Sequence, residues 1–175
     1  YGTTLLGGTF NQGTVFELDA TGTENVLYSF TGQGDGAYPN AALLMDADGT
    51  LYGTANNAGA AGDHGTVFQL DSKGTFTVIH AFAGGHDGSG PDAGLILDQS
   101  GNLYGTTTEG GDADNDGTVF EVNNTGTLTI LHTFTAGPGG AYPYAGLVRD
   151  SAGNLYGTAV DVGPNGNGVV FKISP

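Results

Sequence analysis

Three aspartates at alternate positions form the sharpest chemical motif in the sequence, which reads Asp-Ala-Asp-Asn-Asp-Gly from Asp112 to Gly117. Alternate carboxylates before a glycine turn match the first half of a calcium-binding loop, in which hard oxygen ligands converge on one ion. The twelfth position is Asn123 rather than the glutamate that closes such a loop, so the bidentate ligand is missing. We therefore expect Asp112, Asp114 and Asp116 to form either a weak Ca²⁺ site or a solvated acidic loop, and we expect no other cofactor.

Tyrosines beside prolines form a second candidate site. Tyr38 precedes Pro39, and Tyr142 and Tyr144 flank Pro143, all in glycine-rich segments. Exposed tyrosine rings stack on sugar faces, while nearby Asn and Asp side chains hydrogen-bond hydroxyl groups. These residues predict a carbohydrate-binding site with glycans as the partner. The alternative is a proline-stiffened loop whose tyrosines fold back over the protein.

Asp46, Asp98 and Asp150 recur at intervals of 52 residues. A ring of carboxylates could bind cations or perform acid–base chemistry, but an aspartate that opens a turn and accepts hydrogen bonds from the following amides explains the same recurrence, and we favour that explanation. The sequence shows no Ser-His-Asp set, phosphate-binding glycine loop or HExxH motif, so it predicts no catalytic residue.

The composition excludes several classes of partner. Lys and Arg number 3 against 18 Asp and Glu, which gives a formal net charge of −15. Nucleic-acid binding needs clustered Lys and Arg, and an anionic membrane surface repels an acidic protein. No segment reaches the roughly 20 apolar residues of a membrane helix, so we expect no direct membrane insertion. The absence of cysteine excludes a disulfide scaffold, a thiolate zinc site and a cysteine nucleophile.

The elements that must position these residues follow from a repeat of 52 residues. Two motifs mark it, Tyr-Gly-Thr and Gly-x-Val-Phe. The first begins at Tyr1, Tyr52, Tyr104 and Tyr156, and the second begins at Gly13, Gly65, Gly117 and Gly168. Two motifs that each occur four times with the same period indicate tandem structural units. The predicted units are a partial repeat at 1–36, full repeats at 37–88 and 89–140, and a partial repeat at 141–175, within a single repeat domain.

Each full repeat contains four short apolar runs, exemplified by 93–98, 103–107, 118–122 and 76–82. They are rich in Val, Ile, Phe, Tyr and Thr and are bounded by Gly, Asp and Asn, which is typical of strands joined by hairpin turns. Apolar residues on both faces indicate sheets that are covered on both sides. We expect an all-β array of the β-propeller type, with four-stranded antiparallel blades, about 3.5 repeats and 14 strands. A β-solenoid is the rival architecture.

The motif Gly-Leu-Ile-Leu-Asp-x-x-Gly-Asn-Leu-Tyr-Gly-Thr-Thr, followed by Gly-Thr-Val-Phe-Glu-Val and Leu-Thr-Ile-Leu-His-Thr-Phe, resembles the bacterial GloVer, or choice-of-anchor, tandem repeats. The resemblance covers essentially the whole chain. It implies an exported or surface-anchored, propeller-like protein. Because this family carries no agreed catalytic residues, the resemblance assigns no site.

These observations favour a non-enzymatic, extracellular or cell-surface propeller module that serves surface structure, adhesion or self-assembly. The turns and core recur, while the loops share no catalytic set. The predicted strand order leaves the first and last blades incomplete, so we expect self-association or contact with neighbouring repeats through the open ends. The alternatives are a carbohydrate-binding module that uses the loop tyrosines, or a lyase or hydrolase acting at the propeller axis.

Overall fold

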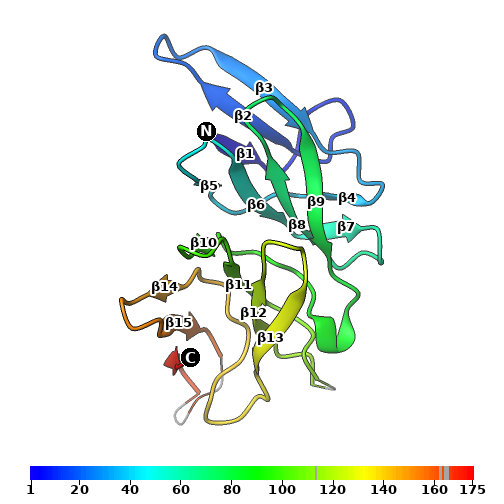
Figure 1. Ribbon diagram of the computed structural model, residues 1–175. Helices are drawn as coiled ribbons and strands as arrows, with labels where there is room; N and C mark the ends of the chain where they lie inside the picture. Colours follow the sequence, from blue (N-terminus) through cyan, green and yellow to red (C-terminus); the bar gives the residue numbers. More distant parts are fainter. Residues whose placement is uncertain (113, 162, 164–165) are drawn as a thin grey trace.

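The computed structural model describes residues 1–112, 114–161, 163 and 166–175 and shows an all-β fold (Figure 1). Four antiparallel sheets follow one another along the chain. Sheet I contains β1 (Gly2–Thr4), β2 (Thr14–Leu18) and β3 (Glu24–Ser29). Sheet II contains β5 (Leu44–Met45), β6 (Leu51–Ala55), β8 (Thr66–Leu70) and β9 (Phe76–Ala81). Sheet III contains β10 (Ile96–Leu97), β11 (Leu103–Thr107), β12 (Thr118–Val122) and β13 (Leu128–Thr133), and sheet IV contains β14 (Val148–Arg149), β15 (Leu155–Ala159) and β16 (Val169–Ile173).

Strand order within the sheets confirms the predicted antiparallel meander. Sheets II and III have four strands each, and sheets I and IV have three, in chain order. Two elements were not predicted, namely a small sheet of β4 (Asp35–Ala37) with β7 (Asn57–Gly59) and a 3₁₀ turn at Gly85–Asp87. None of the helical structure in the described part of the chain is long and apolar enough to cross a membrane.

The predicted strand at 93–98 is wrong in its extent, because only Ile96 and Leu97 pair with β11. The carbonyl of Ala93 instead accepts a 3.2 Å hydrogen bond from Oγ1 of Thr54 in sheet II. Corresponding bonds run from Thr3 to Ala41 at 3.0 Å and from Thr106 to Ala145 at 3.4 Å. The segment before each short first strand is therefore held by the preceding sheet rather than by its own.

The packing of sheet III explains why the two repeat motifs occur together. In the β11–β12 pair, Gly105 of Tyr-Gly-Thr lies opposite Phe120 of Gly-x-Val-Phe. A Cβ atom at Gly105 would lie 2.6 Å from Cζ of Phe120, so the phenyl ring lies directly over the glycine. Gly53 and Phe68 have the same relationship in sheet II, at 2.5 Å. Any larger residue at the glycine would displace the ring.

Three apolar clusters fill the spaces between successive sheets. Phe30 and Phe68 meet edge to face between sheets I and II, with ring centroids 5.2 Å apart. Phe82 and Phe120 repeat this contact at 5.2 Å between sheets II and III, and Phe134 and Phe171 repeat it at 5.2 Å between sheets III and IV. Sheets II and III therefore bury apolar side chains against both of their neighbours, as the two-faced apolar pattern predicted.

Candidate functional site

Two neighbouring depressions lie where β6 and β11 end. The first, of about 420 Å³, is lined by Leu5, Leu6, Tyr38, Asn40, Asn56 and Asp92. The second, of about 340 Å³, is lined by polar residues that include Asp63, Thr108, Glu109 and Tyr144. Asn56 and Asp92 line both depressions, so the two meet at this pair.

The Asp92 carboxylate is held by donors from sheets II and III. Its Oδ1 accepts hydrogen bonds from Nδ2 of Asn56 at 2.8 Å and from Nδ2 of Asn40 at 3.3 Å. Thr108, directly after β11, shares its one hydroxyl proton between the carbonyl of Gly90 at 3.0 Å and Oδ2 of Asp92 at 3.4 Å. A carboxylate has about four acceptor positions, so the half-buried Asp92 can still accept a hydrogen bond from a ligand or from water.

The second depression is rich in hydrogen-bond acceptors. Asp63 and Glu109 add two exposed carboxylates, and Tyr144 adds a side chain that is 54% exposed. Such a lining suits a ligand that presents several hydroxyl groups, because each carboxylate accepts from hydroxyls and an aromatic ring covers the apolar face of a sugar-like ring.

The residues at this junction occupy repeat-equivalent positions whose chemistry differs. The fourth residue after the tyrosine of Tyr-Gly-Thr is Leu5, Asn56, Thr108 or Val160, and the residue after the loop proline is Asn40, Asp92 or Tyr144. The turn aspartates Asp46, Asp98 and Asp150, in contrast, are identical in the three repeats that contain this turn. Sequence reasoning missed Asn56, Asp92 and Thr108, and variation at equivalent positions is the signal that could have found them.

The predicted tyrosine site is brought together only in part. Tyr38 lines the first depression and Tyr144 lines the second. Tyr142 lines neither depression. Its backbone N–H donates to the carbonyl of Asp116 at 2.8 Å, and its hydroxyl interacts with the Asp116 carboxyl. The negative charge of Asp116, together with partial desolvation, raises the pKa of the Tyr142 hydroxyl. Carbohydrate binding through all three tyrosines stays a prediction.

The predicted acidic loop does gather its three carboxylates. One oxygen each from Asp112, Asp114 and Asp116 lies within 4.8 Å of the others, the only such group of ligating side chains in the described part of the chain. Ala113, inside the motif, lies outside the described residues. Asp116 is only 2% exposed. Burial, followed by the charges of Asp112 and Asp114, raises the pKa of its carboxyl.

The recurring aspartates cap turns, which confirms the favoured interpretation. Oδ1 of Asp98 accepts from the backbone N–H groups of Ser100 at 2.8 Å and Asn102 at 2.9 Å, and Oδ2 accepts from the hydroxyl of Tyr104 at 3.1 Å. Burial alone would raise the pKa of Asp98, but the backbone hydrogen bonds outweigh burial and lower it. Asp46 and Asp150 make the same bonds.

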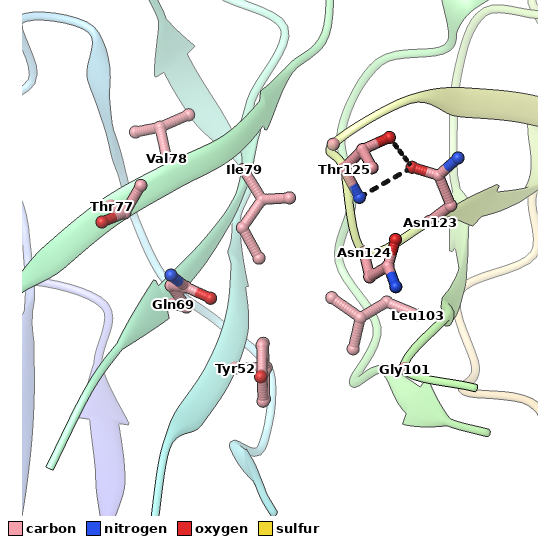
Figure 2. A pocket seen from close by; sticks show the side chains of 11 residues that line it. Tyr52, Gln69, Thr77, Val78, Ile79, Gly101, Leu103, Asn123, Asn124 and Thr125 are labelled. Atoms are coloured by element: carbon pink, nitrogen blue, oxygen red, sulfur yellow. Dashed lines mark hydrogen bonds between the residues drawn. The ribbon is translucent and has the colours of Figure 1, made fainter. Parts of the chain in front are cut away.

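A further groove of about 370 Å³ separates sheets II and III on another part of the surface (Figure 2). Figure 2 shows Tyr52 and Ile79 of sheet II facing the turn of sheet III that contains Asn123 and Thr125. Some of its polar groups already have partners, since Oδ1 of Asn123 accepts from Thr125 and the hydroxyl of Tyr52 donates to Asp46. None of its lining residues carries a carboxylate. The groove is therefore a weaker candidate than the junction at Asp92.

A family model described as the Gloeobacter/Verrucomicrobia repeat matches residues 1–175. The match confirms the GloVer resemblance that the repeat motifs indicated. No curated protein matches the chain.

Two solved structures are similar in fold. One is a gluconolactonase from Xanthomonas campestris, with a TM-score of 0.50 and 18% identity over 93% of this chain and 56% of that one. Another is a luciferin-regenerating enzyme, with a TM-score of 0.56 and 14% identity over 97% of this chain and 60% of that one. The chain thus spans less than two thirds of either structure, and the likeness concerns the propeller-like fold.

These comparisons overturn the expectation of a non-enzymatic module for surface structure, adhesion or self-assembly, because the similar structures are enzymes. The expectation rested on the lack of a catalytic set shared by all repeats. A site built between repeats needs no such set, since each sheet supplies a different side chain, as Asn56, Asp92 and Thr108 do here.

Proposed function

Because the chain belongs to the Gloeobacter/Verrucomicrobia repeat family and has a fold that also occurs in enzymes, we propose that it forms the substrate-binding face of a propeller hydrolase for small hydroxylated lactones. In this proposal the four sheets are blades, and β5, β10 and β14 are the strands nearest the propeller axis. Figure 1 shows these three short strands together on the left side of the view. The similar enzymes support the fold, and the side chains at the Asp92 junction indicate the class of substrate.

The observation that carries the proposal is the hydrogen-bonded Asp92 carboxylate at the junction of two depressions. Its donors come from Asn40, Asn56 and Thr108, which fixes its position without using all of its acceptor capacity. A positioned carboxylate can act as a general base. It would take a proton from a water molecule while the water oxygen attacks the lactone carbonyl carbon. The ring C–O bond then breaks, and the leaving oxygen recovers the proton, giving a hydroxy acid.

The surrounding groups favour a neutral, hydroxylated substrate. Asp63 and Glu109 accept hydrogen bonds from hydroxyls, and the exposed Tyr144 ring can cover one sugar face. The formal net charge of −15 disfavours an anionic substrate and promotes departure of an anionic product. A sugar lactone is neutral, whereas the hydroxy acid formed from it is an anion at neutral pH.

The test is hydrolysis of glucono-1,5-lactone, measured by pH indicator against the buffer rate. The native chain should show saturable acceleration, and Asp92→Asn should lose it by about 100-fold, the lower end of general-base contributions. Asp48→Asn is the matched control, because it removes an exposed carboxylate from a hairpin turn of sheet II. Hydrolysis by the native chain at the buffer rate, or equal rates for native and Asp92→Asn, would refute the proposal.

A further inference from the structure

The acidic loop formed by Asp112, Asp114 and Asp116 contains a buried carboxylate oxygen that lacks a partner. Asp116 is 2% exposed, and its Oδ2 is the only buried side-chain polar atom in the described part of the chain without a hydrogen bond. Burial of an unpaired carboxylate oxygen is costly. Its two nearest carboxylate neighbours, Asp112 and Asp114, add like charge within 4.8 Å. The Tyr142 hydroxyl interacts with this carboxyl, but no Lys, Arg or His side chain in the described part of the chain pairs with it, so its negative charge has no cationic partner.

The equivalent position in sheet II shows what is missing. His64 precedes Gly65 as Asp116 precedes Gly117, and the carbonyl of each accepts a hydrogen bond from the following crossover segment. Nδ1 of His64, however, hydrogen-bonds to Oγ of Ser89 at 3.2 Å. The residue equivalent to Ser89 is Ala141, fully buried and without a hydroxyl. The residues equivalent to Asp112, Asp114 and Asp116 are Ala60, Gly62 and His64. Within the described part of the chain, three carboxylates therefore gather only in the loop before β12.

We propose that Asp112, Asp114 and Asp116 bind one hard divalent cation, Ca²⁺, which supplies the missing partner of the buried Asp116 oxygen. Calcium takes six to eight oxygen ligands, so the carboxylates provide part of the shell and water provides the rest. A shell completed by water gives weak binding, with a Kd on the order of 10⁻⁴ to 10⁻³ M, as in extracellular calcium modules. This site is separate from the junction at Asp92 and does not depend on the proposed hydrolase function.

The position of the loop gives the cation a structural consequence. The N–H of Gly111 donates to the carbonyl of Gly85 at 2.6 Å, and the carbonyl of Asp116 accepts from the N–H of Tyr142 at 2.8 Å. The loop thus contacts both the 3₁₀ turn that follows sheet II and the segment that leads into sheet IV. A cation that neutralises the three carboxylates stabilises these contacts, so calcium binding raises the melting temperature of the folded chain.

The experiment is thermal unfolding with and without 10 mM CaCl₂ at ionic strength held constant with NaCl. The native chain should gain about 3–6 °C, as expected for a millimolar site in a domain of this size. Asp114→Asn should lose most of this gain, and because Asp114 is exposed, this variant should fold normally. Asp116→Asn should also lose the gain, and without calcium it should melt at or above the native temperature, since an uncompensated buried charge is removed.

Asp48→Asn is again the matched control, because Asp46 and Asp48 also alternate before a glycine but do not join a three-carboxylate group. It should keep the full calcium response. The proposal is overturned if native, Asp114→Asn and Asp116→Asn chains gain equally, which would indicate general screening of the negative charge, or if the native chain does not respond to 10 mM Ca²⁺.

Discussion

The side chain of Asn56 donates a 2.8 Å hydrogen bond to Oδ1 of Asp92, although the two residues are 36 positions apart in the chain and belong to different repeats. Asn56 directly follows β6 of sheet II, whereas Asp92 precedes β10 of sheet III. The bond therefore fixes the carboxylate of one repeat from its neighbour. Positioning of this kind is what a general base requires, because proton transfer depends on heavy-atom distance.

Replacement of Asn56 tests this positioning. Asn56→Leu introduces the residue found at the equivalent position Leu5 and removes the shortest hydrogen bond to Asp92. We expect kcat/KM for lactone hydrolysis to fall at least about 10-fold, because the base loses its fixed orientation, while the free energy of unfolding falls by only about 1 kcal/mol. Enzyme kinetics and urea unfolding measure the two effects.

Asn25→Leu is the control for this variant, because Asn25 is an exposed residue of β3 in sheet I. It should leave the kinetics unchanged. A loss of activity in Asn56→Leu that merely follows its loss of folded protein would show that Asn56 has no positioning role.

The strands could be predicted well where a strand and the strand it pairs with lie in the same repeat. The expected segments 103–107 and 118–122 coincide with β11 and β12, because period, β-branched residues and turn aspartates all lie within one repeat. The expected strand at 93–98 is too long because Ala93 bonds to Thr54 of another sheet. A hydrogen bond between two repeats cannot be predicted from the residue pattern of either repeat alone.

The same holds for the candidate sites: a site within one loop could be predicted, and a site formed by two repeats could not. The acidic loop could be predicted because Asp112, Asp114 and Asp116 are neighbours in sequence. The junction at Asp92 could not, since its donors come from two repeats and each is an ordinary polar residue. Asp116 is also bound by the next repeat, through the backbone N–H of Tyr142, which the sequence of the loop does not indicate.

The threonine bonds between sheets should contribute measurably to stability. Thr54 is 2% exposed, and its Oγ1 donates to the carbonyl of Ala93. Thr54→Val keeps the side-chain shape but leaves that carbonyl without this donor, which should lower the free energy of unfolding by about 1–3 kcal/mol in urea titrations. Thr77→Val, at an exposed position of β9, should change it by less than about 0.5 kcal/mol. Equal effects at the two positions would argue against the inter-sheet bond.

The phenylalanine contacts between sheets should dominate stability. Phe120 is fully buried and meets Phe82 across the interface between sheets II and III. Phe120→Ala should cost about 3–5 kcal/mol of unfolding free energy, because it removes a large apolar side chain and leaves a cavity. Phe10, which is 54% exposed, provides the comparison, and Phe10→Ala should cost less than about 1 kcal/mol. A smaller loss at Phe120 than at Phe10 would contradict the inter-sheet core.

The turn aspartates should control stability in acid. The side-chain amide of Asn154 and backbone hydrogen bonds lower the pKa of Asp150 to about 2, and hydrogen bonds at Asp46 and Asp98 outweigh burial and lower their pKa values as well. A carboxyl whose pKa is lower in the folded than in the unfolded state stabilises the fold above the unfolded value of about 4. This contribution is lost as the pH falls from about 4 through the folded pKa. The melting temperature should therefore drop between pH 4 and pH 2.

The triple variant Asp46→Asn, Asp98→Asn, Asp150→Asn isolates this effect. Asparagine can still cap the turn, as Asn123 does by accepting from the N–H groups of Thr125 at 3.0 Å and Thr127 at 2.9 Å. Because asparagine does not titrate, the variant should melt at a lower temperature than the native chain at pH 6 but lose less on acidification to pH 2. Scanning calorimetry across this range measures both slopes. Parallel curves for the two proteins would mean that the turn aspartates have the same pKa folded and unfolded.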